Sequence, residues 1–155
     1  SPRWGTSRGN RAMPFEIIDG MSMADAAFIA RGKDLAELFV SGARALLSIM
    51  LHDPESVMAR ESLRIDLDRG DLDILYYGFL QEFLFYKDAR GLLLVPVRVE
   101  VREKDGSWSC SCEAAGEAID RTRHVFATDV KAVTLHGLEV RREGEVWTAR
   151  TVVDV

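Results

Sequence analysis

The sequence predicts an α+β fold, a two-layer arrangement in which two helices pack on one face of a largely antiparallel β-sheet. The first observation behind this prediction is the order of the elements, which is two strands, a helix, a strand, a helix and then two hairpins. This order lacks the regular strand–helix alternation of a parallel sheet. The second observation is composition, because 155 residues with 47% apolar and 29% charged side chains are typical of one globular domain with a substantial core.

The first part of the chain is interpreted as two strands and a helix. Residues 15–18 and 26–31 are apolar segments of strand length. Asp34 and Glu37 have the spacing of a capping box, in which side-chain carboxylates accept hydrogen bonds from the free N–H groups of a first helical turn. The apolar stripe that follows predicts a helix that ends before Pro54, because proline disfavours a helical residue ahead of it.

The middle of the chain predicts a third strand and a second helix. Apolar and charged residues alternate over residues 63–67, which is typical of a half-buried strand. Asp71 or Asp73 would cap the second helix, and Gly91 stands where a helix commonly ends.

Two hairpins complete the predicted fold. Residues 92–103 and 107–115 alternate on either side of an Asp-Gly turn. Pro96 lies inside the first of these strands, which predicts an edge position or a bulge because proline cannot donate a ladder hydrogen bond. Residues 132–140 and 146–153 predict the second hairpin.

Net charge restricts the partners of the protein. The chain has 20 Lys and Arg and 25 Asp and Glu, a formal net charge of −5. Residues 1–12 carry arginines but no acid, lack apolar periodicity, and are predicted to be a flexible tail or a tag remnant, which leaves residues 13–155 as a single, more acidic domain. An acidic domain repels phosphate backbones and favours a basic protein partner. We therefore expect contact with RNA only indirectly, through such a partner.

Two features of the sequence predict where the protein resides. No apolar run reaches the roughly 20 residues that span a bilayer, so no membrane association is expected. Cys110 and Cys112 lie two residues apart on one face of a predicted strand, where a disulfide would be badly strained. A lone C-x-C pair is not a zinc motif either, and two reduced cysteines favour a cytoplasmic location.

The sequence contains none of the motifs that mark common catalytic sites. It lacks the phosphate loop G-x-x-x-x-G-K-[ST], the zinc motif H-E-x-x-H and the nucleophile elbow G-x-S-x-G. We therefore assign no catalytic residue. Five arginines could form a local basic face or be ordinary solvent-exposed side chains: Arg60, Arg64, Arg69, Arg141 and Arg142.

Two carboxylates have unusual positions. Asp25 opens a buried strand, and Asp154 follows the last predicted strand. If these strands are neighbours, the two carboxylates could meet at one end of the sheet. A hard divalent cation would then relieve their repulsion, and Val155 could add an oxygen ligand. The alternative is that Asp25 caps a turn and Asp154 is an ordinary acid at a frayed end.

The chain resembles the archease family. Members carry a closing pattern K-A-V-T-Y-H-x-L-x-V, and this chain has Lys131-Ala-Val-Thr-Leu-His-Gly-Leu-Glu-Val140. The segment from Trp147 onward resembles the family's last strand with its penultimate aspartate, and Gly116-Glu117 with His124 resembles its G-E…H segment. The resemblance extends over residues 15–155.

The chain also departs from the family pattern at three places. Leu135 replaces the usual tyrosine, and Gly137 stands where an acid is common. The family's H-T-A-D form is reduced to Ala24-Asp25, preceded by residues 20–23. Neither aspartate of the predicted pair is affected.

The resemblance implies a two-helix α+β fold and a non-catalytic accessory role. Archease activates the RtcB-type RNA ligase in tRNA splicing and RNA repair by promoting guanylylation of the ligase and multiple turnover. Carried over by motif, Asp25, Asp154 and Val155 would bind a divalent metal ion, with calcium expected and manganese or magnesium as alternatives. Lys131 and His136 are candidate supporting residues. The expected partner is the ligase, and the protein itself is expected to be a monomer or a weak homo-oligomer.

Two other functions compete with ligase activation. A general chaperone-like binding module would use exposed apolar side chains, for which Met21 and Met23 are the only indication in the sequence. A small metal-dependent hydrolase would combine the two aspartates with a histidine such as His136. Turnover of a phosphoester by the isolated protein would distinguish the hydrolase, and suppression of the aggregation of unrelated proteins would distinguish the chaperone.

Overall fold

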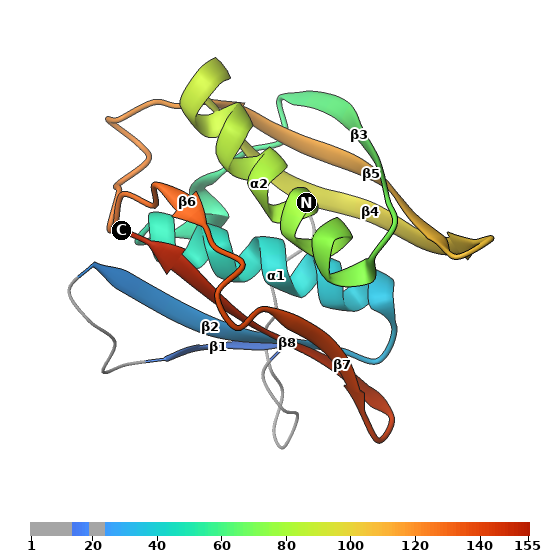
Figure 1. Cartoon of the computed structure of the whole chain (residues 1–155). Coiled ribbons are helices and arrows are strands. Elements are labelled where there is room, and N and C mark those ends of the chain that lie inside the picture. The colour runs from blue at the N-terminus through green and yellow to red at the C-terminus, as the bar shows by residue number, and fades with distance from the viewer. Residues whose placement is uncertain (1–13, 19–23) are drawn as a thin grey trace.

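Two antiparallel β-sheets enclose helix α1 (Leu35–Met50), as Figure 1 shows. The computed structural model of the chain describes residues 14–18 and 24–155. The predicted tail, residues 1–12, and the segment that contains Met21 and Met23 lie outside the described residues.

Five of the described strands form one sheet and three form the other. The five-stranded sheet has the order β1-β2-β8-β6, with β7 also paired to β8; its strands are β1 (Phe15–Ile18), β2 (Asp25–Gly32), β6 (Ala132–Val133), β7 (Glu139–Glu143) and β8 (Val146–Asp154). The three-stranded sheet has the order β3-β5-β4; its strands are β3 (Glu61–Arg69), β4 (Leu92–Lys104) and β5 (Ser107–Ala118). Helix α2 (Leu72–Arg90) packs against the three-stranded sheet, and a short 3-10 turn, η1 (Pro54–Ser56), follows α1.

The capping residues behave largely as the sequence predicts. Asp34 caps α1 by accepting a hydrogen bond of 2.8 Å from the backbone N–H of Glu37. Asp71, rather than Asp73, caps α2, and Gly91 ends it in the left-handed conformation at φ 62°. In the described part of the chain, neither helix combines the length and the apolar character of a bilayer span.

The α+β class, with two helices and antiparallel strands, is confirmed. The structure adds that the strands divide between two sheets, because α1 is buried on two opposite sides and needs apolar cover on both. One side of α1 lies on β2, where Phe28 and Ala30 are fully buried, and the other side lies on β4. The rings of Tyr76 and Phe79 from α2 complete this core. The centroid of each ring lies 5.2 Å from the ring centroid of Phe39 in α1.

The prediction of one continuous strand over residues 132–140 is wrong. The chain pairs with β8 through β6, keeps a hydrogen bond of 2.9 Å from the N–H of Thr134 to Val152, leaves β8 over residues 135–138, and pairs with it again through β7. Gly137 adopts φ 66°, a left-handed conformation that an extended strand cannot contain. The apolar alternation on either side of this turn has the same period as a strand, which is why the sequence pattern does not reveal the break.

Pro96 is accommodated as predicted. Strand β4 lies at the edge of the three-stranded sheet, and its register with β5 shifts between Pro96 and Arg98. The missing N–H of proline therefore costs no ladder hydrogen bond in the sheet centre.

The two cysteines are buried free thiols in β5, on the face predicted for them. Burial raises the pKa of both Cys110 and Cys112 to about 12. Because the thiolate is the reactive form, alkylation by iodoacetamide at pH 8 is expected to be about a thousandfold slower in the folded protein than for an ordinary cysteine. Mass spectrometry after timed exposure measures this rate, and the same protein in urea provides the control. Rapid modification of the folded protein would contradict the expected burial.

Candidate functional site

The carboxylate pair predicted from the sequence occurs in the fold. Strands β2 and β8 are antiparallel neighbours, and Asp25 lies directly opposite Asp154 in their register. The adjacent residues Ala26 and Val153 face the core. Since side chains alternate along a strand, both carboxylates project from the outer face of the five-stranded sheet. Side chains of such directly opposed residues have Cβ atoms about 4.5–5.5 Å apart.

Main-chain hydrogen bonds hold this end of the sheet in place. The N–H of Val155 donates to the carbonyl oxygen of Ala24 at 3.0 Å. On the other side of β8, the N–H of Lys131 donates to the carbonyl oxygen of Asp154 at 2.8 Å. The backbone of Asp154 is thus fixed between two neighbours, while its side chain is exposed and that of Asp25 is half-buried.

The donor set fits a hard divalent cation in part. Two carboxylates and an oxygen of Val155 are ligands of the type that calcium prefers, and calcium takes six to eight oxygens. Like charges directly opposite each other on a sheet are destabilising, so a bound cation would offset that cost. Within residues 14–18 and 24–155, however, no three His, Cys, Asp or Glu side chains are grouped closely enough to hold a metal ion together. Water or oxygen atoms of a partner would have to complete the coordination shell of the cation.

The two candidate supporting residues flank β6 at the edge of the five-stranded sheet. Lys131 is exposed and immediately precedes β6, whose Ala132 is opposite Asp154. His136 is exposed in the turn between β6 and β7, and its N–H donates to the hydroxyl of Thr134 at 3.3 Å. The described residues do not group His136 with the two aspartates, so the ligand set of the hydrolase hypothesis is not assembled.

A second charged cluster surrounds Glu117, which is 2% exposed at the end of β5. Its carboxylate accepts hydrogen bonds from Arg123 (2.5 and 3.1 Å), Arg60 (3.1 Å) and the N–H of Met58 (2.7 Å), and Nε2 of His124 lies at 3.0 Å. The hydrogen bond from Arg123 is the largest of the effects that lower the pKa of Glu117 to about 2, against the opposing effect of burial. Glu117 is therefore ionised at every physiological pH.

The Glu117 cluster joins segments of the chain rather than forming an open site. Nδ1 of His124 accepts a hydrogen bond of 2.9 Å from the N–H of Asp120, so Nε2 carries the proton and donates to Glu117. The cluster fastens the segment after α1 to the connection after β5. Gly116 is required beside it, because a Cβ there would collide with the carbonyl oxygen of Leu93. The G-E…H pattern in the sequence thus marks a structural cluster.

The arginines singled out in the sequence do not form one face. Arg60, Arg64 and Arg69 belong to β3 or the segment before it. Arg141 and Arg142 are neighbours on β7 and point to opposite faces, with Arg142 lying over the ring of Trp147.

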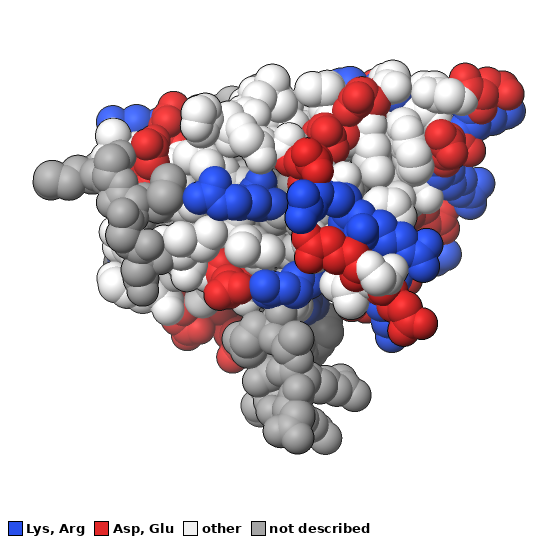
Figure 2. Space-filling view, turned by 60° about the horizontal axis from the view of Figure 1, so that its bottom comes forward, with Lys and Arg blue, Asp and Glu red and all other residues white. Residues whose placement is uncertain are grey.

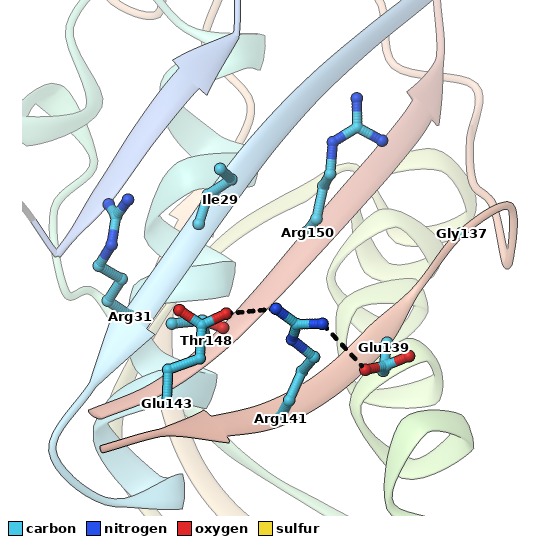
Figure 3. Close-up of a pocket in the computed structure, with 8 residues that line it drawn as sticks. All are labelled: Ile29, Arg31, Gly137, Glu139, Arg141, Glu143, Thr148 and Arg150. Carbon is cyan, nitrogen blue, oxygen red and sulfur yellow. Dashed lines mark hydrogen bonds and ion pairs between the residues drawn. The ribbon is translucent and has the colours of Figure 1, made fainter. Parts of the chain in front are cut away.

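A different set of arginines surrounds a hollow of about 350 Å³ on the outer face of the five-stranded sheet, shown in Figure 3. Arg31, Arg141 and Arg150 come from three adjacent strands, β2, β7 and β8. Arg31 and Arg150 are not among the residues that the sequence pattern indicates. The signal that could have found them is their alternation with the buried residues Ala30, Ala149 and Thr151.

The fold and the position of the carboxylate pair define a structural class: a small α+β protein in which the second strand pairs with the last, with an aspartate of each at the shared end. Residues 15–155 match the model of the Archease protein family. The chain belongs to this family. The protein archease of Methanopyrus kandleri is 36% identical over 143 residues, which are 92% of this chain and all of that protein. The protein archease of Methanothermobacter thermautotrophicus is 36% identical over 141 residues, 91% of this chain and 98% of that protein.

Solved structures agree with this assignment. The solution structure of protein 1598 of Methanobacterium thermoautotrophicum superposes with a TM-score of 0.79 at 34% identity, covering 92% of this chain and 99% of that one. The crystal structure of an archease from Thermotoga maritima, described as a possible chaperone, superposes with a TM-score of 0.55 at 15% identity, covering 97% of this chain and all of that one. The second similarity concerns the fold alone.

Proposed function

We propose that this protein activates an RtcB-type RNA ligase in tRNA splicing and RNA repair, by promoting guanylylation of the ligase and so allowing multiple turnover. Membership of the archease family supports the proposal. The observation that carries it is the juxtaposition of Asp25 and Asp154 at the common end of β2 and β8. This end of the sheet is where an acidic protein could approach a basic or metal-bearing active site of a partner.

In this proposal Asp25, Asp154 and an oxygen of Val155 hold a divalent cation, with calcium expected and manganese or magnesium as alternatives. The cation supplies positive charge that can orient anionic oxygens at the ligase active site. The aspartates offer oxygen ligands on a rigid sheet, and Lys131, whose backbone N–H donates to the carbonyl oxygen of Asp154 at 2.8 Å, would balance part of their charge. Because β2 and β8 are central strands of the sheet, the geometry of the pair is set by the ladder and not by a loop.

The protein carries out no bond-making step in this proposal. It acts by binding more tightly to the ligase conformation that accepts the nucleotide than to other conformations, and it shifts the ligase population by that difference in affinity. Such an activator is released after each cycle and can serve many ligase molecules.

A multiple-turnover ligation assay tests the proposal. The protein is mixed at a tenth of the ligase concentration with an RtcB-type ligase, GTP, manganese and an excess of cleaved tRNA halves. The expected result is that ligated product rises well above one equivalent of ligase, whereas the ligase alone stops near one equivalent. Product that stays at one equivalent with every ligase of the same source would overturn the proposal.

A chaperone-like binding module remains the second candidate, and the description of the Thermotoga maritima archease as a possible chaperone is what favours it. The large exposed apolar side chains of the described residues lie on different elements, for example Phe85 on α2, Val97 on β4 and Leu135 between β6 and β7. Scattered exposure of this kind is common on soluble proteins. Suppression of the aggregation of unrelated proteins, unchanged by loss of Asp25, would favour the chaperone instead of the ligase activator.

A further inference from the structure

Three arginines share the outer face of the five-stranded sheet. Arg31 of β2 and Arg141 of β7 are both opposite Thr148 of β8, so the three residues form one row across the sheet. In the next row Arg150 of β8 lies between Ile29 of β2 and Glu139 of β7. Figure 3 shows the three guanidinium groups standing on the same side of these strands, around the hollow described above.

The ion pairs on this face are exposed and easily exchanged. Arg31 pairs with Glu16 at 2.7 Å, and Arg141 pairs with Glu143 at 2.5 Å and with Glu139 at 3.6 Å. All of these side chains are between 31% and 62% exposed. Exposed pairs contribute little to stability because water and salt screen them. Arg31 and Arg141 can therefore take new carboxylate partners at small cost.

The arginines and the carboxylate pair lie on the same face of the five-stranded sheet, with the buried residues Ala27 and Val152 in the row between them. Asp154 and Arg150 are both on the outer face of β8 and four residues apart, which is roughly 13 Å along a strand. Both helices contact the sheet from its other side, and within the described residues no helix or strand covers this face. In Figure 2, which turns this face forward, basic side chains run as a band with acidic side chains on both sides of it. A partner that reaches the two aspartates would also meet the band.

We propose that this outer face is the surface that docks on the ligase, with Arg31, Arg141 and Arg150 opposite acidic side chains of the ligase surface that surrounds its active site. The inference rests on the proposed function. A protein surface fits better than an RNA strand, because Glu16, Glu139 and Glu143 are paired with Arg31 and Arg141 and would repel a continuous phosphate backbone. A protein can place acidic side chains opposite the arginines and basic side chains opposite the glutamates.

The test is a double charge reversal, Arg141→Glu with Arg150→Glu, in the full-length protein. A matched control is Arg98→Glu with Arg102→Glu on the other sheet, where both arginines are exposed on one strand and pair with Glu100 at 3.1 and 2.9 Å. The dissociation constant for the ligase is measured by surface plasmon resonance at low salt. It is expected to rise at least tenfold for the Arg141/Arg150 variant, mainly through slower association, and to stay within twofold for the control. The difference is expected to shrink near 1 M salt, where charges are screened within about 3 Å.

Two further measurements separate the inference from the function on which it rests. Calcium binding by calorimetry and the melting temperature are expected to be the same for wild type and the Arg141/Arg150 variant, which shows that the carboxylate pair and the fold are intact. If the wild type stimulates the ligase and the variant binds it equally tightly, the docking surface is wrong and the proposed function stands. If the variant loses affinity for labelled RNA and keeps its affinity for the ligase, the face binds RNA and the inference is overturned. If the wild type neither binds nor stimulates the ligase, the proposed function fails and the inference fails with it.

Discussion

Replacing Asp154 by Asn is expected to abolish stimulation of the ligase while leaving the fold intact. The Asp154 side chain is exposed at the end of β8, and the β2–β8 ladder that positions it is made by the backbone. An amide of the same shape therefore removes the charge and keeps the sheet. The expected result is at least a tenfold loss of multiple-turnover product, with a melting temperature close to that of the wild type. Asp25→Asn is expected to give the same loss, because a divalent cation needs both carboxylates.

The control for this pair is an exposed carboxylate on the other sheet. Asp68 lies in β3 and is exposed, so Asp68→Asn changes the net charge by the same amount without touching the pair. It is expected to stimulate the ligase as the wild type does. Calorimetric titration with calcium is a second readout, in which the Asp25 and Asp154 variants lose binding and Asp68→Asn keeps it. Full stimulation by either pair variant would exclude the carboxylates from the mechanism.

Of the substitutions described here, Glu117→Gln is expected to cause the largest loss in the free energy of unfolding. Five N–H groups point at this buried carboxylate, from Met58, Arg60, His124 and twice from Arg123. Glutamine offers one acceptor oxygen, and its NH₂ would face donors. The arginines can turn to water, but His124 is 1% exposed and cannot. We expect a loss of about 2–3 kcal/mol in the free energy of unfolding, or roughly 5–10 °C in melting temperature.

Urea unfolding measures this loss, and Glu113→Gln is the control because Glu113 is exposed on the same strand. That control is expected to change stability by less than about 0.5 kcal/mol. Equal stability of the two variants would show that the Glu117 cluster does not hold the fold.

The ionisation of Glu117 also determines how the stability of the folded protein depends on pH. Its pKa in the folded protein is about 2, below its ordinary value of 4.5. A group whose pKa falls on folding stabilises the folded state fully above its unfolded pKa, and this contribution is lost as pH falls through the folded pKa. The stability difference between wild type and Glu117→Gln is therefore expected to be constant above about pH 5 and to shrink progressively toward pH 2. A difference that grows as pH falls would contradict the assignment.

Local features of the sequence predicted most of the elements of this fold. The caps at Asp34 and Asp71, the stop at Gly91 and the edge position of Pro96 each depend on residues within a few positions of one another. Such signals are contained in the sequence itself. The division into two sheets is not, because it depends on which strands cover the two sides of α1.

The sequence could predict the candidate site only on the condition that two particular strands are neighbours in the sheet. The sequence places Asp25 and Asp154 at strand ends, but whether those strands are neighbours depends on the pairing of segments at opposite ends of the domain. The break at Gly137 was missed because its apolar alternation continues on both sides of the turn. Arg31 and Arg150 were missed because a single arginine in a strand carries no signal until the register aligns it with others.

The pairing of β2 with β8 also has a consequence for the order of folding. The hairpin of β4 and β5 joins residues that are close in sequence, whereas Asp25 and Asp154 are separated by almost the whole domain. Closing so long a loop costs more entropy than closing a hairpin, and contacts of this kind form late. An intermediate with the three-stranded sheet formed and the five-stranded sheet open would lack the carboxylate pair entirely. A cation or partner that bridges β2 and β8 would then bind only the fully folded protein and would stabilise it against that intermediate.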